Sequence, residues 1–166
     1  MDHDQLKKSL RKRLKAERNA LSPVEVTQKS NEIFERWRNR FSLKQTAWLH
    51  LFLSMKHRNE VDTQPFIDYI WTKHSRIRLV VPILPEGSVT LQHGHLSPDT
   101  KIEISSWGIP EPVMPIPLVQ PMMLDMVLIP MLGFDLDGNR IGYGAGHYDR
   151  FLSLTRPQCL KIGICF

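Results

Sequence analysis

Short, nearly continuous apolar runs, separated by segments of helical periodicity, restrict the fold more than any other feature of this chain. The runs span residues 46–54, 77–84 and 125–130, and a fourth, 159–166, closes the sequence. Such strands are typical of parallel sheets, because a parallel sheet is covered on both faces. Helices are expected over 4–20, 23–40 and 61–74, and from about Gly146. The alternation predicts one α/β domain, a layered α/β/α architecture with a largely parallel central sheet.

Local signals mark where some of these elements begin. Ser22, Pro23 and Glu25 have the spacing of a capping box at the start of the second helix. Asp62 or Thr63 is expected to cap the third. Residues 88–94 are expected to pair with 77–84 as a hairpin. Five prolines between residues 107 and 121 exclude a helix there.

Composition excludes several classes of protein. With 166 residues, 42% of them hydrophobic, the chain is long enough to bury one core. No apolar run approaches the roughly 20 residues of a membrane span, and the charged N-terminus is not a secretory signal. Cys159 and Cys165 fit neither a disulfide framework nor a C-x-x-C motif. We therefore expect reduced, mostly buried thiols in a cytoplasmic protein.

The net charge of +5 is unevenly distributed. Seven lysines and arginines lie between Lys7 and Arg18, against the single acidic residue Glu17. Such a run attracts polyanions: nucleic acid, phosphate-rich cofactors or acidic substrates. The plainer alternative for most of these residues is a solvated helix face. Lys7 and Arg11, four residues apart, lie on one side of the expected helix.

A glycine-rich segment follows the third apolar run, where ligands collect in open α/β sheets. Four of the nine glycines of the chain are Gly138, Gly142, Gly144 and Gly146. Their backbone N–H groups can cluster around an anion, and the helix that follows adds its positive end. Asp149 is suited to hold Mg²⁺ against phosphate oxygens, while Arg140 and Arg150 flank the segment and can clamp phosphate. It is neither a Walker loop nor a dinucleotide fingerprint, and a plain glycine-rich hairpin is the alternative.

Two histidines, His93 and His95, suggest a metal site as a second possible function. Together they would supply two metal ligands, but no third ligand stands near them in the sequence. Two histidines without a third ligand more often lie on the surface of a hairpin. We therefore expect His93 and His95 on a hairpin surface.

The segment LIPMLGFDLDGNRIGYGAGHYDRFL, residues 128–152, resembles the signature of the 5-formyltetrahydrofolate cyclo-ligase family. That signature has a strand ending in Pro, then Phe-Asp, then Gly-x-Arg-Leu-Gly-x-Gly-x-Gly-Tyr-Tyr-Asp-Arg. KKSLRKRLKAERNALSPVE, FLSMKHRNEVDTQP and SWGIPEP match further family segments in the same order. Tyr143 stands where a basic or small residue is common, and His147 replaces the usual Tyr.

The resemblance implies ATP-dependent closure of 5-formyltetrahydrofolate to 5,10-methenyltetrahydrofolate, with release of ADP and phosphate and with Mg²⁺ as cofactor. It implies catalytic roles for Arg140 and Lys7 and a metal-binding role for Asp149. Met55, Glu60, Trp107 and Tyr148 are implied at the folate site. The ATP site implied by the family comprises Lys7, Lys8, Ser9, Leu10, Arg11, Arg140, Ile141, Gly142, Tyr143, Gly144, Ala145, Gly146, His147 and Tyr148.

Some of these residues have a purely structural alternative: a cap of the following helix for Glu60, and a core position for Trp107. The family continues past the last strand and supplies a second acidic residue near Mg²⁺, so we expect residues 1–166 to be one cyclo-ligase-like domain without its C-terminal tail. We expect a monomer that binds small molecules and neither nucleic acid nor a membrane. Two other hypotheses stay open, a folate- and nucleotide-binding paralogue without turnover and a nucleic-acid-binding module that uses the basic helix.

Overall fold

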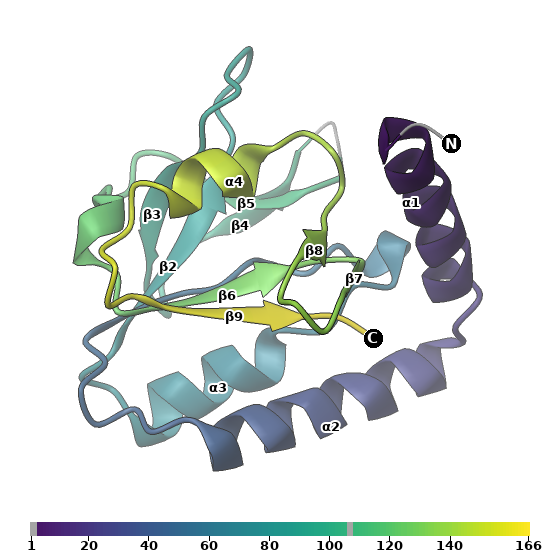
Figure 1. Ribbon diagram of the computed structural model, residues 1–166. Coiled ribbons are helices and arrows are strands. Elements are labelled where there is room, and N and C mark those ends of the chain that lie inside the picture. The colour runs from purple at the N-terminus through teal and green to yellow at the C-terminus, as the bar shows by residue number, and fades with distance from the viewer. Residues whose placement is uncertain (1–2, 106–107) are drawn as a thin grey trace.

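A five-stranded sheet with helices on both faces forms the centre of the molecule, as the sequence predicted (Figure 1). The computed structural model describes residues 3–105 and 108–166. The strand order is β3-β2-β1-β6-β9, and only the pairing of β2 with β3 is antiparallel. The strands of this sheet are β1 (Trp48–His50), β2 (Arg78–Ile83), β3 (Gln92–Leu96), β6 (Met126–Pro130) and β9 (Leu160–Ile164).

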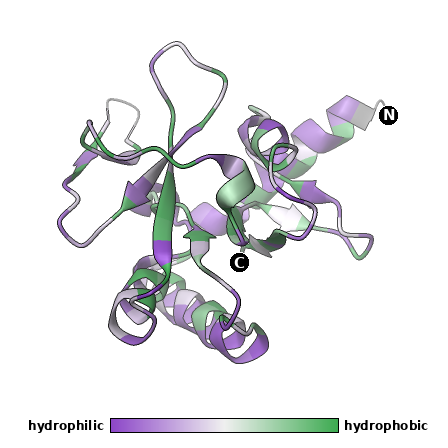
Figure 2. Ribbon diagram, turned by 90° about the vertical axis from the view of Figure 1, so that its left-hand side faces the viewer, coloured by the Kyte–Doolittle hydropathy of each residue, from purple (hydrophilic) through white to green (hydrophobic). Residues whose placement is uncertain are grey.

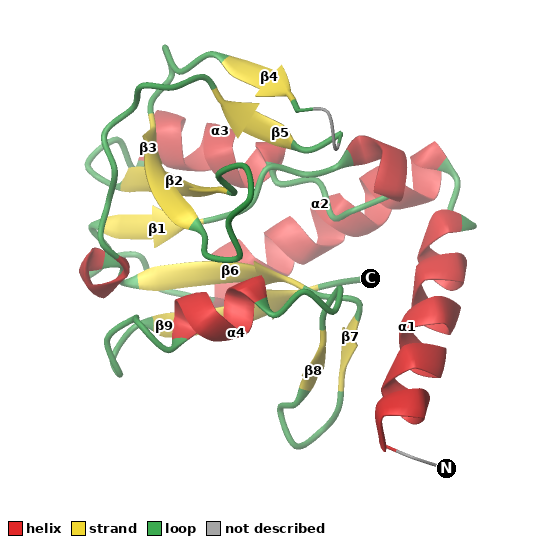
Figure 3. Ribbon diagram, turned by 90° about the horizontal axis from the view of Figure 1, so that it is seen from above, coloured by secondary structure: helices red, strands yellow, loops and turns green. Residues whose placement is uncertain are grey.

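Two helices lie below the sheet and one short helix above it in Figure 1. The lower pair is α2 (Pro23–Arg40) and α3 (Gln64–Lys73), and α4 (His147–Leu152) lies over β6 and β9 (Figure 3). The first helix, α1 (His3–Asn19), stands beside the sheet next to the small hairpin of β7 (Gly133–Phe134) and β8 (Arg140–Ile141). A second small hairpin joins β4 (Ile102–Ile104) and β5 (Pro110–Pro112).

The core has two parts because both faces of the sheet are covered. Trp37, Phe66 and Ile70 of the lower helices pack with Leu49 and Leu128 of the strands. A second apolar cluster between the sheet and α4 is built from Val80, Val119, Leu124, Val127, Ile129, Met131, Phe151 and Cys159. Hydrophilic residues, by contrast, run along most of α1 (Figure 2). None of the helices in the described part of the chain is long and apolar enough to cross a membrane.

The helix starts resolve the capping alternatives. The Ser22–Glu25 capping box is confirmed, with the side chain of each residue accepting a hydrogen bond from the backbone N–H of the other. At α3 the carboxylate of Asp62 accepts a hydrogen bond from Gln64 N at 3.0 Å. Thr63 instead turns inward, where its hydroxyl donates to Phe52 O at 2.7 Å. Thr63 thus occupies the N-cap position without a side-chain cap bond, and Asp62, one residue earlier, supplies the side-chain acceptor at the start of α3.

Asp125 aligns the beginnings of three strands. Its Oδ2 accepts hydrogen bonds from Ala47 N at 2.8 Å and Trp48 N at 2.9 Å. Its Oδ1 accepts from Arg156 at 2.6 Å, and its backbone carbonyl accepts from Leu160 N. The carboxylate of Asp125 thus fixes the register of β1 against β6, and its backbone carbonyl fixes the register of β9 against β6. The carboxyl ends of these three strands therefore lie at the same edge of the sheet.

The histidine pair on the antiparallel strand differs from the expectation. The partner of β2 is 92–96 rather than 88–94, and His93 is buried instead of lying on a hairpin surface. Its Nδ1 lies 3.2 Å from Nε2 of the fully buried His50, and both rings contact Phe151 of α4. The expectation was wrong because α4 covers this face of the sheet, which the local sequence of the hairpin does not reveal.

Both of these buried histidines are held in the neutral form. Burial lowers the pKa of His93 to about 4. Burial, and next the proximity of His93, lowers the pKa of His50 well below its ordinary range. Among the described residues there is no group of three potential metal ligands. The pair is therefore a packed element of the core beneath α4.

Acid should weaken the fold through this pair. Unfolded histidines bind protons below about pH 6.5 while the folded ones stay neutral, so stability is lost as the pH falls from about 6.5 towards 4. His93 alone should contribute a loss of about 2 kcal/mol between pH 7 and pH 5. Urea unfolding at several pH values should show a shallower pH dependence for His93→Gln than for wild type. His57→Gln, at an exposed position, serves as the control. Equal slopes for all three proteins would contradict the assignment.

Candidate functional site

A cleft of about 520 Å³ opens at the carboxyl ends of β1, β2 and β6. This is the edge at which α/β sheets bind ligands. Its walls come from α1, from the segments after β1 and β2, from β5 and from the connection between β8 and α4. The lining residues are Lys7, Arg11, Phe52, Leu53, Met55, Arg58, Glu60, Pro82, Leu84, Leu91, Ile109, Pro110, Glu111, Pro130 and all of 140–149.

The glycine loop, residues 142–146, runs from β8 to α4 along this cleft. Gly144 and Gly146 have φ angles of 109° and 70°, which side chains with a Cβ rarely adopt. The loop is held against α1, because Nε of Arg11 donates a hydrogen bond to Gly142 O at 3.1 Å. The glycines therefore allow a path that ordinary residues would strain, and they leave the backbone of the loop accessible from the cleft.

Basic side chains from three separate segments reach the same cleft. Lys7 and Arg11 come from one side of α1, Arg58 comes from the short 3-10 helix η1 (Lys56–Arg58), and Arg140 comes from β8. Lys8 and Ser9 are exposed outside the cleft lining, and half-buried Leu10 is also outside it. The structure thus places Lys7, Arg11 and Arg140 in one cleft, whereas the side chains of residues 8–10 lie outside its lining.

Arg150, which the sequence suggested as a phosphate clamp, instead binds backbone carbonyls. Its guanidinium donates hydrogen bonds to Val89 O and Ala145 O, each at 2.8 Å. His147 Nδ1 also donates to Val89 O at 2.8 Å. These contacts tie the glycine loop to the segment between β2 and β3, so Arg150 holds the loop in position.

Asp149 lies at the rim of the cleft in an ion pair with Arg140. Its side chain is 76% exposed, whereas that of Arg140 is 19% exposed. A single accessible carboxylate offers an oxygen ligand to a divalent cation but no complete set of protein ligands. Asp149 therefore fits a cation that takes its other ligands from a bound phosphate and water.

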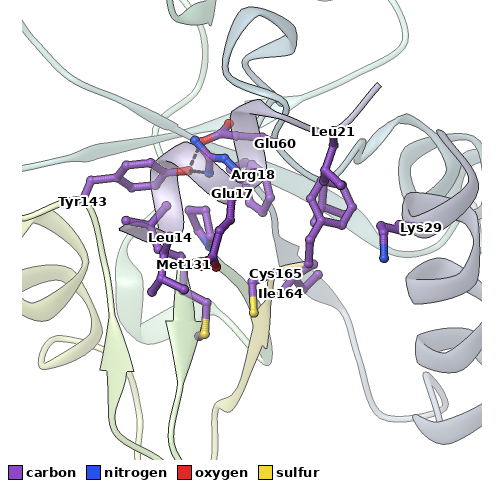
Figure 4. A pocket seen from close by; sticks show the side chains of 15 residues that line it. Leu14, Glu17, Arg18, Leu21, Lys29, Glu60, Met131, Tyr143, Ile164 and Cys165 are labelled. Atoms are coloured by element: carbon purple, nitrogen blue, oxygen red, sulfur yellow. Dashed lines mark hydrogen bonds between the residues drawn. The ribbon is translucent and has the colours of Figure 1, made fainter. Parts of the chain in front are cut away.

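Glu60 is a buried carboxylate that also lines the cleft, only 5% exposed. Its Oε2 accepts a hydrogen bond from Met55 N at 2.9 Å, and its Oε1 accepts one from the hydroxyl of Tyr143. Arg18 Nη1 in turn donates to the Tyr143 hydroxyl at 2.5 Å (Figure 4). Glu60 does not cap α3, because its oxygens accept from these other donors and the side-chain acceptor at the start of α3 is Asp62.

Tyr148 forms part of the cleft wall beside the buried histidine His50. Its hydroxyl oxygen is buried and has no hydrogen-bond partner among the described residues. Burial, and next the negative charge of Glu60, raises the pKa of Tyr148. Met55 also lines the cleft, whereas Trp107, the fourth residue expected at the folate end, lies outside the described residues.

Asn59 and Arg18 also help to build the cleft, but the sequence did not mark either of them as a site residue. Asn59 has a left-handed backbone with a φ of 47°, and its side-chain amide donates to Leu21 O at 2.8 Å and Arg18 O at 3.2 Å. It therefore fixes the end of α1 beside Glu60. Asparagine is enriched among residues with positive φ, which is the one signal in the sequence. Arg18 gave no separate signal, because it is one of the seven basic residues of the run from Lys7 to Arg18.

The model of the 5-formyltetrahydrofolate cyclo-ligase family matches residues 3–164, almost the whole chain. The chain belongs to this family. A 5-formyltetrahydrofolate cyclo-ligase from Haemophilus influenzae is 28% identical over 165 residues, which cover 98% of this chain and 86% of the relative. One from Mus musculus is 30% identical over 152 residues, 88% of this chain and 73% of the relative.

Solved structures of family members share the fold. The 5,10-methenyltetrahydrofolate synthetase of Aquifex aeolicus superposes with a TM-score of 0.79 at 27% identity, over 97% of this chain and 78% of that one. The enzyme of the same name from Mycoplasma pneumoniae gives 0.75 at 26% identity, over 96% and 84%. Membership of the cyclo-ligase family therefore accounts for the layered architecture.

Proposed function

We propose that this protein catalyses the ATP-dependent cyclisation of 5-formyltetrahydrofolate to 5,10-methenyltetrahydrofolate, with release of ADP and phosphate. Its membership of the cyclo-ligase family supports this activity. The single observation that carries the proposal is that one cleft is lined by four basic side chains (Lys7, Arg11, Arg58 and Arg140), a glycine loop and a buried carboxylate. The first two suit a polyphosphate, and the carboxylate suits the N–H donors of a pterin.

The reaction needs both substrates in one cleft because the formamide carbon is a poor electrophile. The formyl oxygen attacks the γ-phosphorus of ATP, and the bond to ADP breaks. N10 of the folate then attacks the activated formyl carbon and loses its proton, and the carbon–oxygen bond breaks to release phosphate. Phosphoryl transfer of this kind depends mainly on positioning and charge neutralisation, which the chain supplies through fixed cations.

The ATP end is assigned to Lys7, Arg11, Arg140 and the segment 141–148. Backbone N–H groups of the glycine loop would bind phosphate oxygens. Arg140 and Lys7 would neutralise the charge that develops on the transferred phosphoryl group. Because Lys8, Ser9 and Leu10 lie outside the cleft lining, the proposal for α1 rests on the side chains of Lys7 and Arg11.

The folate end is assigned to Glu60, Met55 and Tyr148. Glu60 is already bound on both oxygens, yet a carboxylate has about four lone-pair sites and can accept further hydrogen bonds. The apolar side chain of Met55 and the ring of Tyr148 provide flat or adaptable surfaces for the pterin. Trp107 belongs to this proposal through the family resemblance alone.

Further parts of the proposal concern the setting of the enzyme. The two cysteines are free thiols, Cys159 buried and Cys165 half-buried, which agrees with a reducing compartment such as the cytoplasm. We expect a monomer whose partners are folate and ATP. Nucleic acid is not expected as a partner, because Lys7 and Arg11 are turned into the cleft; binding that weakened steeply with added salt would indicate otherwise.

Mg²⁺ should bind this protein together with nucleotide and not alone, because the proposed phosphate end relies on the single carboxylate of Asp149 and not on a set of protein ligands. Calorimetry should show no saturable Mg²⁺ binding by the protein at millimolar concentration, and tighter ATP binding when Mg²⁺ is present. Asp149→Asn should remove that gain, and Asp137→Asn, exposed on the turn between β7 and β8, should preserve it. Tight Mg²⁺ binding without ATP, or an unchanged gain in Asp149→Asn, would contradict the assignment.

Arg140→Ala should lower kcat/KM for ATP by about 100-fold or more, because it removes a fixed charge aimed at the phosphoryl group. The assay is the absorbance of the methenyl product formed from 5-formyltetrahydrofolate, ATP and Mg²⁺. Arg38→Ala, which removes an arginine paired with Glu35 on the far side of the sheet, is the matched control. Turnover of Arg140→Ala at the wild-type rate would place the ATP site elsewhere, and absence of turnover in wild type would favour the paralogue without activity.

Glu60→Gln should weaken folate binding by about 10- to 100-fold and change ATP binding much less, since the lost charge-assisted hydrogen bonds are worth roughly 1.5–3 kcal/mol. Calorimetric titration with each ligand separately measures the two effects. Glu103→Gln, an exposed carboxylate on β4, should leave both affinities unchanged. Equal losses for both ligands in Glu60→Gln would mean that Glu60 serves the architecture of the cleft and not the pterin.

A further inference from the structure

Tyr143 lies in a wall between two cavities. The large cleft and a second cavity of about 200 Å³ share four lining residues, Phe52, Glu60, Pro130 and Tyr143. The second cavity is lined by residues near the ends of α1 and β9, among them Arg18, Leu21 and Cys165, and it is reached from the glycine loop by Tyr143 (Figure 4). Tyr143 therefore borders both cavities, and its hydroxyl reaches Glu60 in the wall that they share.

Tyr143 connects three segments that are distant in the sequence. Its hydroxyl donates to Glu60 Oε1 across 83 residues and accepts from Arg18 Nη1 across 125 residues. The guanidinium of Arg18 also lies over the Tyr143 ring, 5.3 Å from its centroid. Burial, followed by the charge of Glu60, raises the pKa of Tyr143, so its proton is retained. The chain of contacts from α1 through the glycine loop ends on the carboxylate of Glu60.

We propose that Tyr143 is a positioning residue for folate, which orients the carboxylate of Glu60 and couples the folate end of the cleft to the glycine loop. This inference rests on the proposed function. With Met55 N on one oxygen and the Tyr143 hydroxyl on the other, Glu60 has one fixed orientation. A carboxylate has about four lone-pair sites, so others remain for the N–H donors of a ligand. A carboxylate fixed before binding loses less conformational freedom when the pterin arrives.

The coupling follows from the position of Tyr143 between Gly142 and Gly144. ATP bound along the loop restricts the loop backbone, and with it the hydroxyl that holds Glu60. Nucleotide should therefore raise the affinity for folate, and by thermodynamic linkage folate should raise the affinity for nucleotide by the same factor. A role in stability alone would produce no such reciprocal effect.

The decisive variant is Tyr143→Phe, which removes the hydroxyl and keeps the ring. We expect KM for 5-formyltetrahydrofolate to rise by about 10-fold, the range of one hydrogen bond to a charged group, with kcat changed less than twofold. The ratio of folate Kd values without and with a non-hydrolysable ATP analogue should fall towards one. Tyr69→Phe, the same deletion in the aromatic cluster between α2 and α3, is the control and should match wild type.

A double-mutant cycle with Glu60→Gln separates an action through Glu60 from direct contact with the substrate. If Tyr143 acts through Glu60, Tyr143→Phe should weaken folate binding in the wild-type background and have little effect in Glu60→Gln. An equal loss in both backgrounds would overturn the inference in favour of direct contact, and tighter folate binding by Tyr143→Phe would overturn it in favour of competition for Oε1. Folate binding that is unchanged in Tyr143→Phe but weakened in Glu60→Gln would sink this inference and leave the proposed function intact. Wild type that binds no folate would overturn both.

Discussion

The cleft depends on polar contacts that hold α1 against two loops. Arg11 donates to the carbonyl of Gly142 near the middle of the helix, Arg18 donates to Tyr143 further along, and the amide of Asn59 binds the carbonyls at its end. Because α1 stands beside the sheet and is largely hydrophilic (Figures 1 and 2), these directional contacts set its position. They also place Lys7 and Arg11 opposite the glycine loop.

The cleft is lined by groups of opposite charge, and the combination suits two substrates of different chemistry. The cations of α1 and β8 lie beside a glycine loop, with Asp149 exposed at the rim. The buried carboxylate of Glu60 is held by a backbone N–H and by a neutral tyrosine of that loop. A buried carboxylate without such partners would be costly. Fixed hydrogen bonds therefore stabilise the charge where a pterin is proposed to bind.

The supports beneath the cleft are equally specific. Asp125 aligns the starts of the parallel strands, so their opposite ends open at the same edge. The neutral pair of His50 and His93 packs under Phe151 of α4, next to the residues that lead out of the glycine loop. The loop thus ends in a helix whose underside is part of the core, and this restricts the path of its backbone.

The sequence by itself determined that apolar strands alternate with helices in a largely parallel sheet. It also determined the Ser22–Glu25 capping box and the glycine-rich segment. Each depends on periodicity or on residues within a few positions of one another. Only the tertiary structure decided that His93 is buried, that Arg150 holds the loop, that Asp62 supplies the side-chain acceptor at the start of α3 and that Tyr143 meets Glu60. Burial and hydrogen bonding at these positions depend on segments up to 125 residues apart in the chain. Local patterns carry no information about which distant side chain arrives there, because that is fixed by how the layers pack.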